Sequence, residues 1–310
     1  MSKQNLVSVQ SSGWLNPMFT DARSKEAFEF IKKCGFDALD YNLDTKLIAA
    51  QINKSEKGTF FTKTFEELEE YYAPIKAAAE ETGIVFGQAH APYPLFRRTD
   101  ADMSEYLMET VEKCCFICNY LSIPALVVHP LTYVLYEKEQ ERELNLAMYR
   151  RIMPFAKKYG VKICLENMWT MYNGRVMMGT CATAEEAVWY IDKLNEEAGE
   201  DIFGFCFDIG HATLVDANIR EYVNTLGHRL TVLHLHDNDG IHDQHYAPMT
   251  QKKTDWTGLI DGLCDIGYKG TINFETAAAI MNKYPMELFP DMLEYIAEVG
   301  KYIREKVLEK

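Results

Sequence analysis

Residues 204–237 read GFCFDIGHATLVDANIREYVNTLGHRLTVLHLHD, and this stretch predicts a strand, a helix and a second strand. The apolar run Gly204–Asp208 and the run Thr231–His236 have the composition of buried strands. Between them, Ile219–Leu226 carries apolar residues at helical spacing. Two strands joined through a helix are typically parallel neighbours in one sheet, so the stretch predicts one β-α-β unit.

The same alternation of strand and helix continues on both sides of this stretch and occurs eight times along the chain. The other predicted strands are Leu6–Ser11, Ala38–Tyr41, Val85–His90, Ala125–His129, Lys162–Glu166 and Thr271–Glu275. The other predicted helices are Ser24–Cys34, Phe65–Thr82, Met103–Leu121, Glu139–Tyr159, Ala184–Leu194, Trp256–Asp265 and Leu288–Val307. No linker rich in proline or glycine divides the chain. Because eight β-α units close a barrel, we expect an α/β fold, a single (β/α)8 TIM barrel over residues 1–310.

The composition is that of an ordinary globular protein. Of 310 residues, 47% are apolar and 25% are charged, and 32 Lys plus Arg against 46 Asp plus Glu give a formal net charge of −14. Nonspecific affinity for nucleic acids comes mainly from Lys and Arg, so nucleic acid is a disfavoured partner.

The apolar runs are too short to cross a membrane. The longest, such as Cys114–Cys118 and Ala125–Val128, fall far short of the roughly 20 residues that a bilayer requires. The first residues lack the apolar core of a secretory signal, and the eight cysteines lie mostly in apolar runs, as reduced thiols do. We therefore expect a cytoplasmic protein with no membrane partner, and a homo-oligomer stays open.

The clearest functional signal is a series of His, Asp and Glu residues at the ends of successive predicted strands. The strand ends read AHAPY (89–93), VVHP (127–130), CLEN (164–167), FDIGH (207–211), HLHDND (234–239) and NFET (273–276). Asp243 and His245 lie in the loop that follows HLHDND. In a (β/α)8 barrel the carboxyl ends of the strands form the functional face. These side chains are therefore expected to meet in the mouth of the barrel.

Such a ring of side chains predicts a divalent metal. Carboxylates and imidazoles that converge in a barrel mouth repel one another or stay unsatisfied unless a cation lies among them. Glu166, Asp208, His234 and Glu275 come from four successive strands and offer three carboxylates and one imidazole. This ligand set suits Mn²⁺, Co²⁺, Mg²⁺ or Zn²⁺, and Mn²⁺ is our first choice. His211, three residues after Asp208, is a candidate proton shuttle.

In this order, the strand-end residues resemble the xylose-isomerase-like barrel superfamily, in particular its sugar phosphate isomerases and epimerases. The most specific pieces are LEN, D-x-x-H-A and HLHDNDG, followed by D-x-H and DW at Asp255-Trp256. The resemblance implies a metal held by Glu166, Asp208, His234 and Glu275, with the two glutamates flanking the substrate as acid and base. One departure concerns residues 246–256, YAPMTQKKTDW, where many relatives have a stretch rich in Pro-Pro-Gly. The substrate therefore stays open.

The expected reaction is the interconversion of small sugars or sugar phosphates by proton transfer next to a carbonyl, through an enediolate. Glu166 and Glu275 would exchange the proton, and His211 would act beside them. The expected substrate-binding residues are His90, His129, His236, Asp243, His245, Trp14 and Trp169. Arg97, Arg98 and Arg175 lie in mouth-side loops and are candidate anchors for a substrate phosphate or carboxylate, although a solvated surface role explains each of them as well.

Two other functions stay open. A lyase or dehydratase acting on keto-sugars or keto-glycosides would use the same metal site. The same positions also resemble the ligand set of endonuclease IV, a DNA repair nuclease with a three-zinc cluster, in which His90, His129, His211, Asp243 and His245 would be further ligands. The net charge of −14 argues against a DNA substrate.

Overall fold

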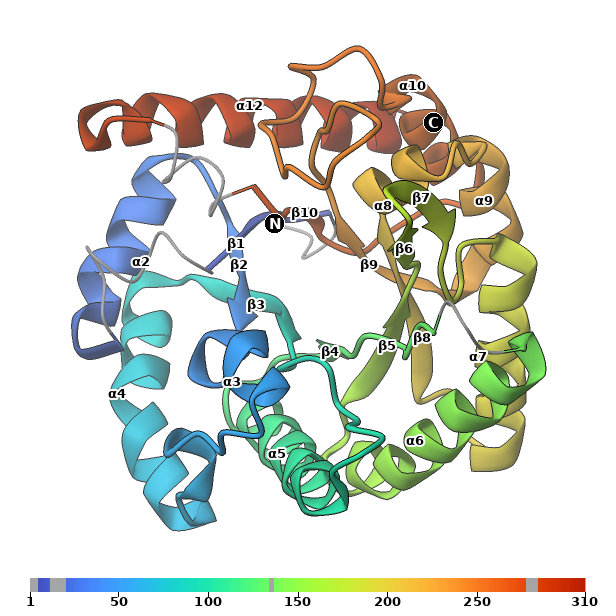
Figure 1. Ribbon diagram of the computed structural model, residues 1–310. Coiled ribbons are helices and arrows are strands. Elements are labelled where there is room, and N and C mark those ends of the chain that lie inside the picture. The colour runs from blue at the N-terminus through green and yellow to red at the C-terminus, as the bar shows by residue number, and fades with distance from the viewer. Residues whose placement is uncertain (1–4, 12–20, 134–136, 277–283, 310) are drawn as a thin grey trace.

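The computed structural model describes residues 5–11, 21–133, 137–276 and 284–309. In that part of the chain, eight parallel strands follow one another around a barrel (Figure 1). They are β1 (Val7–Gln10), β2 (Ala38–Asn42), β3 (Val85–His90), β4 (Ala125–Val127), β5 (Lys162–Glu166), β8 (Phe203–Asp208), β9 (Leu230–His234) and β10 (Ile272–Phe274). The backbone N–H of Leu235 donates to the oxygen of Asn273 over 3.0 Å, which joins the end of β9 to β10. The predicted TIM barrel is confirmed, and its extent as one domain over 1–310 stays a prediction.

Helices ring the barrel and fill the connections where the sequence predicts them (Figure 1). They are α2 (Ser24–Lys33), α4 (Phe65–Thr82), α5 (Ala101–Tyr120), α6 (Lys138–Tyr159), α7 (Ala184–Ala198), α9 (Ile219–Leu226), α10 (Trp256–Asp265) and α12 (Phe289–Leu308). The largest difference from the prediction is at the end of α7, which continues past Leu194. Gly199, with φ of 67°, ends that helix in the left-handed conformation. No described helix combines the length and apolar character needed to cross a bilayer.

The loops above the barrel contain short elements that the sequence pattern did not predict. They include α3 (Ala49–Asn53), α8 (Ile209–Leu214) and an antiparallel hairpin of β6 (Trp169–Tyr172) and β7 (Arg175–Met178). The hairpin turns at Asn173-Gly174, where both residues have positive φ, and Asn-Gly is a strong signal for such a turn. The hairpin follows β5 directly and so stands beside the mouth of the barrel.

The alternation of side chains along the strands explains where the polar residues lie. A small apolar cluster contains Cys164 of β5, Cys206 of β8 and Val232 of β9. Successive side chains of a strand point to opposite faces, so residues two positions further along share the face of that cluster. Those residues are Glu166, Asp208 and His234. The polar side chains thus form the next layer above a small apolar layer, at the carboxyl ends of the strands.

Candidate metal centre

Four side chains from four strand ends meet in the mouth of the barrel. Glu166, Asp208, His234 and Glu275 each offer one ligand atom, and these atoms all lie within 4.8 Å of one another. Glu166, Asp208 and His234 are buried, whereas the side chain of Glu275 is 14% exposed. The sequence-predicted quartet is therefore brought together, with Glu275 on the side open to the mouth.

His234 lies between the two glutamates. Its Nδ1 is 3.2 Å from Oε1 of Glu166 and 3.2 Å from Oε2 of Glu275. Its Nε2 points the other way, to Oδ2 of Asp40 at 3.5 Å. The ring therefore presents Nδ1 to the cluster and Nε2 to a buried carboxylate, which is the arrangement that fixes the tautomer of a metal-binding histidine.

The second oxygen of each glutamate has its own neighbour. Oε2 of Glu166 is 3.0 Å from Nε2 of His129. Oε1 of Glu275 accepts a hydrogen bond from the side-chain amide of Gln10 at the end of β1. Each glutamate is thus held at both ends of its carboxylate, and its orientation in the pocket is set by the protein.

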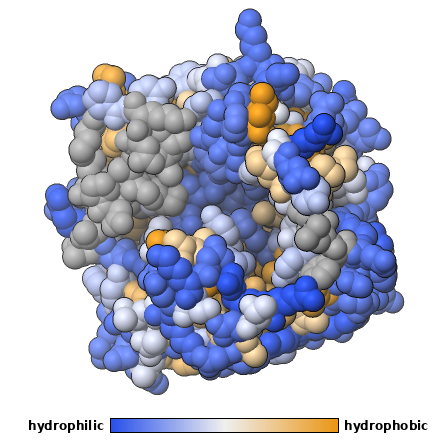
Figure 2. Space-filling view, in the orientation of Figure 1, coloured by the Kyte–Doolittle hydropathy of each residue, from blue (hydrophilic) through white to orange (hydrophobic). Residues whose placement is uncertain are grey.

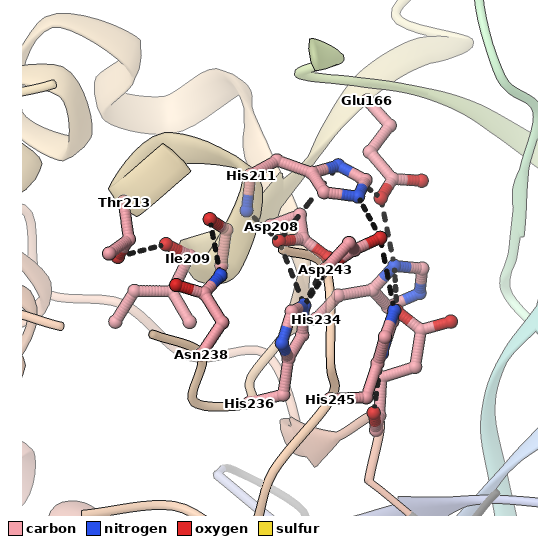
Figure 3. A network of polar contacts seen from close by, with 12 residues as sticks. Glu166, Asp208, Ile209, His211, Thr213, His234, His236, Asn238, Asp243 and His245 are labelled. Carbon is pink, nitrogen blue, oxygen red and sulfur yellow. Dashed lines mark hydrogen bonds and ion pairs between the residues drawn. The ribbon is translucent and has the colours of Figure 1, made fainter. Parts of the chain in front are cut away.

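Asp208 is held by two histidines and by the start of α8 (Figure 3). Its Oδ1 accepts from the backbone N–H of His211 over 2.6 Å and caps the helix. Nε2 of His236 is 3.1 Å from both carboxylate oxygens. The His236 ring stacks on that of His245 with centroids 3.9 Å apart. His236 is fully buried, so it lies behind Asp208 and beside His245.

Asn167 fixes the relative position of the two strands that carry Glu166 and Asp208. Its side-chain amide donates to the backbone oxygen of Asp208 over 2.7 Å, and its side-chain oxygen accepts from the backbone N–H of Asp208 over 2.8 Å. This pair of hydrogen bonds ties the end of β5 to the end of β8. The motif LEN therefore supplies one candidate ligand and the residue that holds its neighbour in place.

Three further histidines are oriented by the same kind of hydrogen bond, between Nδ1 of the ring and a backbone oxygen. The pairs are His90 with Ala91 at 2.7 Å, His211 with Asn167 at 2.8 Å and His245 with Glu275 at 2.8 Å. Because a carbonyl oxygen only accepts, Nδ1 carries the proton in each ring. Nε2 of each ring therefore faces the pocket.

The three Nε2 atoms meet two side chains, His129 and Asp243. Nε2 of His90 is 2.9 Å from Nε2 of His129, beside Glu166. Nε2 of His211 and Nε2 of His245 are each 3.3 Å from Oδ2 of Asp243. Among the described residues, three other sets of side chains are close enough together to hold a metal ion: His90, His129 and Glu166; His236, Asp243 and His245; and Glu166, His234 and Cys206, which shares two residues with the quartet.

The electrostatics of the cluster follow from its burial and its mixed charge. Burial opposes ionisation of Glu166, but His234 and His129 outweigh it and hold the pKa of this carboxyl well below its usual range. Burial alone would lower the pKa of His211, but Asp208 and Asp243 outweigh burial and raise this pKa well above the ordinary value. For His90, burial is outweighed by Glu166 and the pKa rises to about 8. For His245, burial is outweighed by Glu275 and Asp243 and the pKa rises to about 9. Without a metal, charged histidines thus balance the carboxylates.

The quartet fits a divalent cation. In the described part of the chain, the ion-pair partners of Glu166, Asp208 and Glu275 are all histidines. Buried carboxylates of this kind need a compensating positive charge, and a divalent ion supplies it without requiring each histidine to bind a second proton. Three carboxylates and an imidazole are a donor set for Mn²⁺, Co²⁺, Mg²⁺ or Zn²⁺.

A pocket of about 80 Å³ lies above the cluster. Its lining residues are Asp44, His90, Tyr93, His129, Glu166, His211, Asp243, His245 and Glu275. Figure 2 looks onto the same face and shows a hollow with largely hydrophilic walls. Most of the predicted catalytic and substrate-binding residues therefore border one small space, which we call the inner pocket.

Of the two predicted tryptophans, only Trp169 lies among the described residues, and several polar neighbours of the site were not predicted. Trp14 lies outside the described residues. Trp169 begins β6 and is absent from the described lining of the inner pocket. Gln10 and Asp40 come from β1 and β2. The prediction considered only His, Asp and Glu at the ends of the later strands. Polar residues within the apolar strands β1 and β2 were the signal that could have identified this pair.

Comparison with known proteins identifies related sequences. A family model described as a xylose isomerase-like TIM barrel matches residues 27–299. An uncharacterized protein of Methanocaldococcus jannaschii is 31% identical over 169 residues, which cover 54% of this chain and 52% of that protein. An uncharacterized protein of Sinorhizobium fredii is 30% identical over 95 residues, covering 31% of this chain and 30% of that protein. The chain spans about half or less of the length of these curated relatives.

Solved structures with the same fold include sugar epimerases. The 3-keto-D-glucoside 4-epimerase YcjR from E. coli has a TM-score of 0.67 at 17% identity, covering 95% of this chain and 100% of that one. A D-psicose 3-epimerase from Clostridium cellulolyticum H10 has a TM-score of 0.69 at 17% identity, covering 96% and 99%. The IOLI protein, solved with a binding zinc atom, has a TM-score of 0.65 at 18% identity, covering 97% of each chain. At these identities the likeness shows the shared fold.

Proposed function

Because the chain belongs to the xylose isomerase-like TIM-barrel family, we propose that it is a metal-dependent sugar or sugar phosphate isomerase or epimerase. The observation that carries this proposal is the convergence of Glu166, Asp208, His234 and Glu275 within 4.8 Å at the bottom of a small polar pocket. Structural neighbours that are sugar epimerases support the same class of substrate. The protein would then act on a small sugar-derived molecule.

We propose that these four residues hold one divalent ion, with Mn²⁺ as the first choice. When bound, the ion would polarise a substrate carbonyl and offset the negative charge that develops on its oxygen. The protein contributes ligands whose orientation is already set, since His234 is oriented by Asp40 and Glu275 by Gln10.

Glu166 and Glu275 are the proposed acid and base. Their facing oxygens, Oε1 and Oε2, are each 3.2 Å from the same nitrogen of His234, so both carboxylates border the space where the substrate carbon would sit. One glutamate would remove the proton next to the carbonyl, and the other would return a proton to the enediolate. Return to the opposite face gives epimerisation, whereas return to the neighbouring carbon gives isomerisation.

His211 is the proposed partner of the developing oxyanion. Nδ1 of its ring meets the backbone oxygen of Asn167, and Nε2 meets Asp243, so the ring has acceptors on both sides that favour its charged form. A charged imidazole stabilises negative charge on a nearby oxygen. His90, His129, His236, Asp243, His245, Trp169 and Trp14 remain proposed substrate-binding residues, with the buried His236 acting through the His245 ring on which it stacks.

The test is proton exchange with solvent. The protein is loaded with Mn²⁺ and incubated in D₂O with a panel of ketoses and keto-glycosides, and deuterium at the carbon next to the carbonyl is measured by NMR and mass spectrometry. Incorporation together with an epimeric or isomeric product supports the proposal. Loss of a water or an aglycone would instead assign the lyase, while a panel with no conversion and no exchange would count against both.

A metal-dependent phosphodiesterase is the second candidate, favoured by one observation. Beside the quartet, His90 with His129 and Glu166, and His236 with Asp243 and His245, are candidate ligand sets for further ions. The net charge of −14 opposes a DNA substrate. Incision of a duplex containing an abasic site, abolished by a chelator, would select this function, and elemental analysis would then show about three metal equivalents. The expected cytoplasmic location and the oligomeric state stay predictions.

A further inference from the structure

A second pocket adjoins the inner pocket and is larger. The outer pocket, as we call it, measures about 380 Å³, against about 80 Å³ for the inner pocket. It lies between the loops that follow β3, β4 and β5. Tyr93 and His129 line both pockets. The two pockets are therefore adjacent, with the Tyr93 and His129 rings, whose centroids are 4.5 Å apart, at the boundary between them.

The wall of the outer pocket is mainly apolar and aromatic. Tyr93 and Phe96 come from the loop after β3, Leu131 and Tyr133 from the loop after β4, and Met168 from the segment after β5. Tyr93 is 38% exposed, so an aromatic face remains available at the junction of the two pockets. Rigid rings and a flexible thioether suit a flat or apolar group and provide few donors for a phosphate.

Two of the three guanidinium nitrogens of Arg97, a residue of this wall, donate hydrogen bonds to another part of the protein. Nη1 and Nη2 of Arg97 donate to the side-chain and backbone oxygens of Asn53 in α3, over 2.9 and 3.1 Å. Arg97 therefore braces the loop after β3 against α3. Arg98, the other arginine of the wall, is exposed and has an interaction of its own. This arrangement favours an uncharged occupant over a phosphate.

We propose that the outer pocket is the subsite for an uncharged, apolar or aromatic group joined to the sugar, so that the substrate is a glycoside whose aglycone lies between Tyr93, Phe96 and Met168. The inference rests on the proposed function for the position of the sugar. It deepens that function by naming the substrate class: a sugar with a bulky substituent on the side facing the loops after β3 and β4. A free ketose would fill the inner pocket and leave the larger space unused.

Calorimetric titration tests the subsite without requiring turnover. The Mn²⁺-loaded protein is titrated with phenyl β-D-glucopyranoside and with methyl β-D-glucopyranoside, which differ in the aglycone alone. We expect the phenyl glycoside to bind at least tenfold more tightly, and a crystal of the complex to place the ring against Tyr93, Phe96 or Met168. Equal affinities, no binding of the phenyl glycoside, or a ring bound elsewhere would overturn the proposal. So would a gain of similar size for glucose 6-phosphate over glucose, which would make the pocket an anion site.

Variants of the wall provide a second, independent measurement. The backbone of Met168 is hydrogen bonded to Thr180 over 2.9 Å and to Gly179 over 3.0 Å, so Met168→Ala removes the side chain while keeping the local fold. We expect Met168→Ala to weaken binding of the phenyl glycoside three- to tenfold and to leave the methyl glycoside unchanged. Met171→Ala is the matched control, because Met171 is 48% exposed on β6 and is not among the described lining of either pocket.

These results are separable from the fate of the proposed function. Tighter binding of the phenyl glycoside with no deuterium exchange on any sugar would keep the subsite and reject the isomerase. Exchange on ketoses together with equal binding of the two glucosides would keep the isomerase and reject the subsite. An effect of Met171→Ala equal to that of Met168→Ala would also reject it.

Discussion

His234 and Asp40 form a buried imidazole–carboxylate pair, with Nε2 of the ring 3.5 Å from Oδ2 of the carboxylate and neither side chain exposed. The same oxygen accepts from the side-chain amides of Gln88 over 3.1 Å and Asn273 over 3.0 Å. Residues of β2, β3 and β10 thus orient a histidine of β9. A carboxylate at Nε2 keeps a proton there and leaves the lone pair of Nδ1 directed into the candidate metal centre.

We therefore expect Asp40→Asn to weaken metal binding by about 10–100-fold, the usual cost of losing such a partner. The amide has nearly the volume of the carboxylate, so the melting temperature of the metal-free protein should change little. Affinity is measured by competition with a chromophoric chelator. Asp216→Asn, at an exposed position with φ of 56°, is the control because Asn accepts that backbone conformation. Unchanged metal affinity in Asp40→Asn would show that Asp40 does not orient His234 for metal binding.

The proposed roles of Glu166 and Glu275 as acid and base predict the effect of replacing each of them by glutamine. Glu166→Gln and Glu275→Gln should each lower turnover by about 10²–10⁴, since each removes a proton-transferring group without removing much volume. Some metal should remain bound, because an amide oxygen is still a weak ligand. Rates are compared at saturating Mn²⁺, with the exposed Glu105→Gln as control. Full activity in both variants would contradict the mechanism more strongly than absence of deuterium, because a shielded base can return the proton that it removed.

Much of this architecture was predictable because two periodicities act together. Alternation along the strands places Glu166 above Cys164 and His234 above Val232, and the barrel topology brings all the carboxyl ends to one mouth. A linear sequence therefore indicates which residues share that mouth. Whether each of these residues binds a metal or transfers a proton also depends on distances between particular atoms. Positions along the strands do not determine those distances.

The contributions of Gln10 and Asp40 were not predictable in the same way. Each lies in a strand that the pattern predicts, but its role depends on register: Gln10 reaches Glu275 because β1 pairs with β10, and Asp40 reaches His234 across the barrel interior. The Trp169–Met178 hairpin had a local signal in Asn173-Gly174, yet its strands are too short for periodicity to reveal. Long-range register and short elements are the parts that the sequence pattern leaves undetermined.

The charged histidines predict how the stability of the metal-free protein changes with pH. Since the pKa of His90 is raised from 6.5 to about 8, its proton stabilises the folded state fully below pH 6.5, and this contribution is lost as the pH rises through 8. The difference corresponds to about 2 kcal/mol, and His245, with a pKa of about 9, acts in the same direction. The melting temperature of the chelator-treated protein should therefore fall between pH 6.5 and 9.5.

Metal binding should have the opposite dependence. A histidine ligand must be deprotonated, and bound metal replaces the positive charge that protons otherwise supply, so the rise in melting temperature caused by Mn²⁺ should grow over the same pH range. His90→Gln should flatten the profile of the metal-free protein, whereas the exposed His228→Gln should leave it unchanged. A metal-free melting temperature that rises from pH 6.5 to 9.5 would show that these histidines are not held charged.

The close approach of Gly210 to His236 gives the last prediction. A Cβ built on Gly210 would lie 1.9 Å from Cε1 of His236, and two contacts oppose movement of that ring. It is stacked on His245 at 3.9 Å, and its Nε2 contacts both oxygens of Asp208 at 3.1 Å. Gly210→Ala should therefore displace the ring and release Asp208, at a cost of about 1–3 kcal/mol in the free energy of unfolding and with weaker metal binding.

A double-mutant cycle separates this clash from a general effect on α8. His236→Ala removes the ring, so Gly210→Ala in that background should cost little further stability, and the coupling between the two sites should reach about 1–3 kcal/mol in denaturant unfolding. Metal binding should stay weak in the double variant, because Asp208 has lost its partner in either case. Additive effects on stability, or a Gly210→Ala protein with unaltered melting temperature and metal affinity, would mean that His236 does not depend on the missing side chain at Gly210. The expected non-additivity would tie a glycine in the FDIGH motif directly to the orientation of the Asp208 ligand.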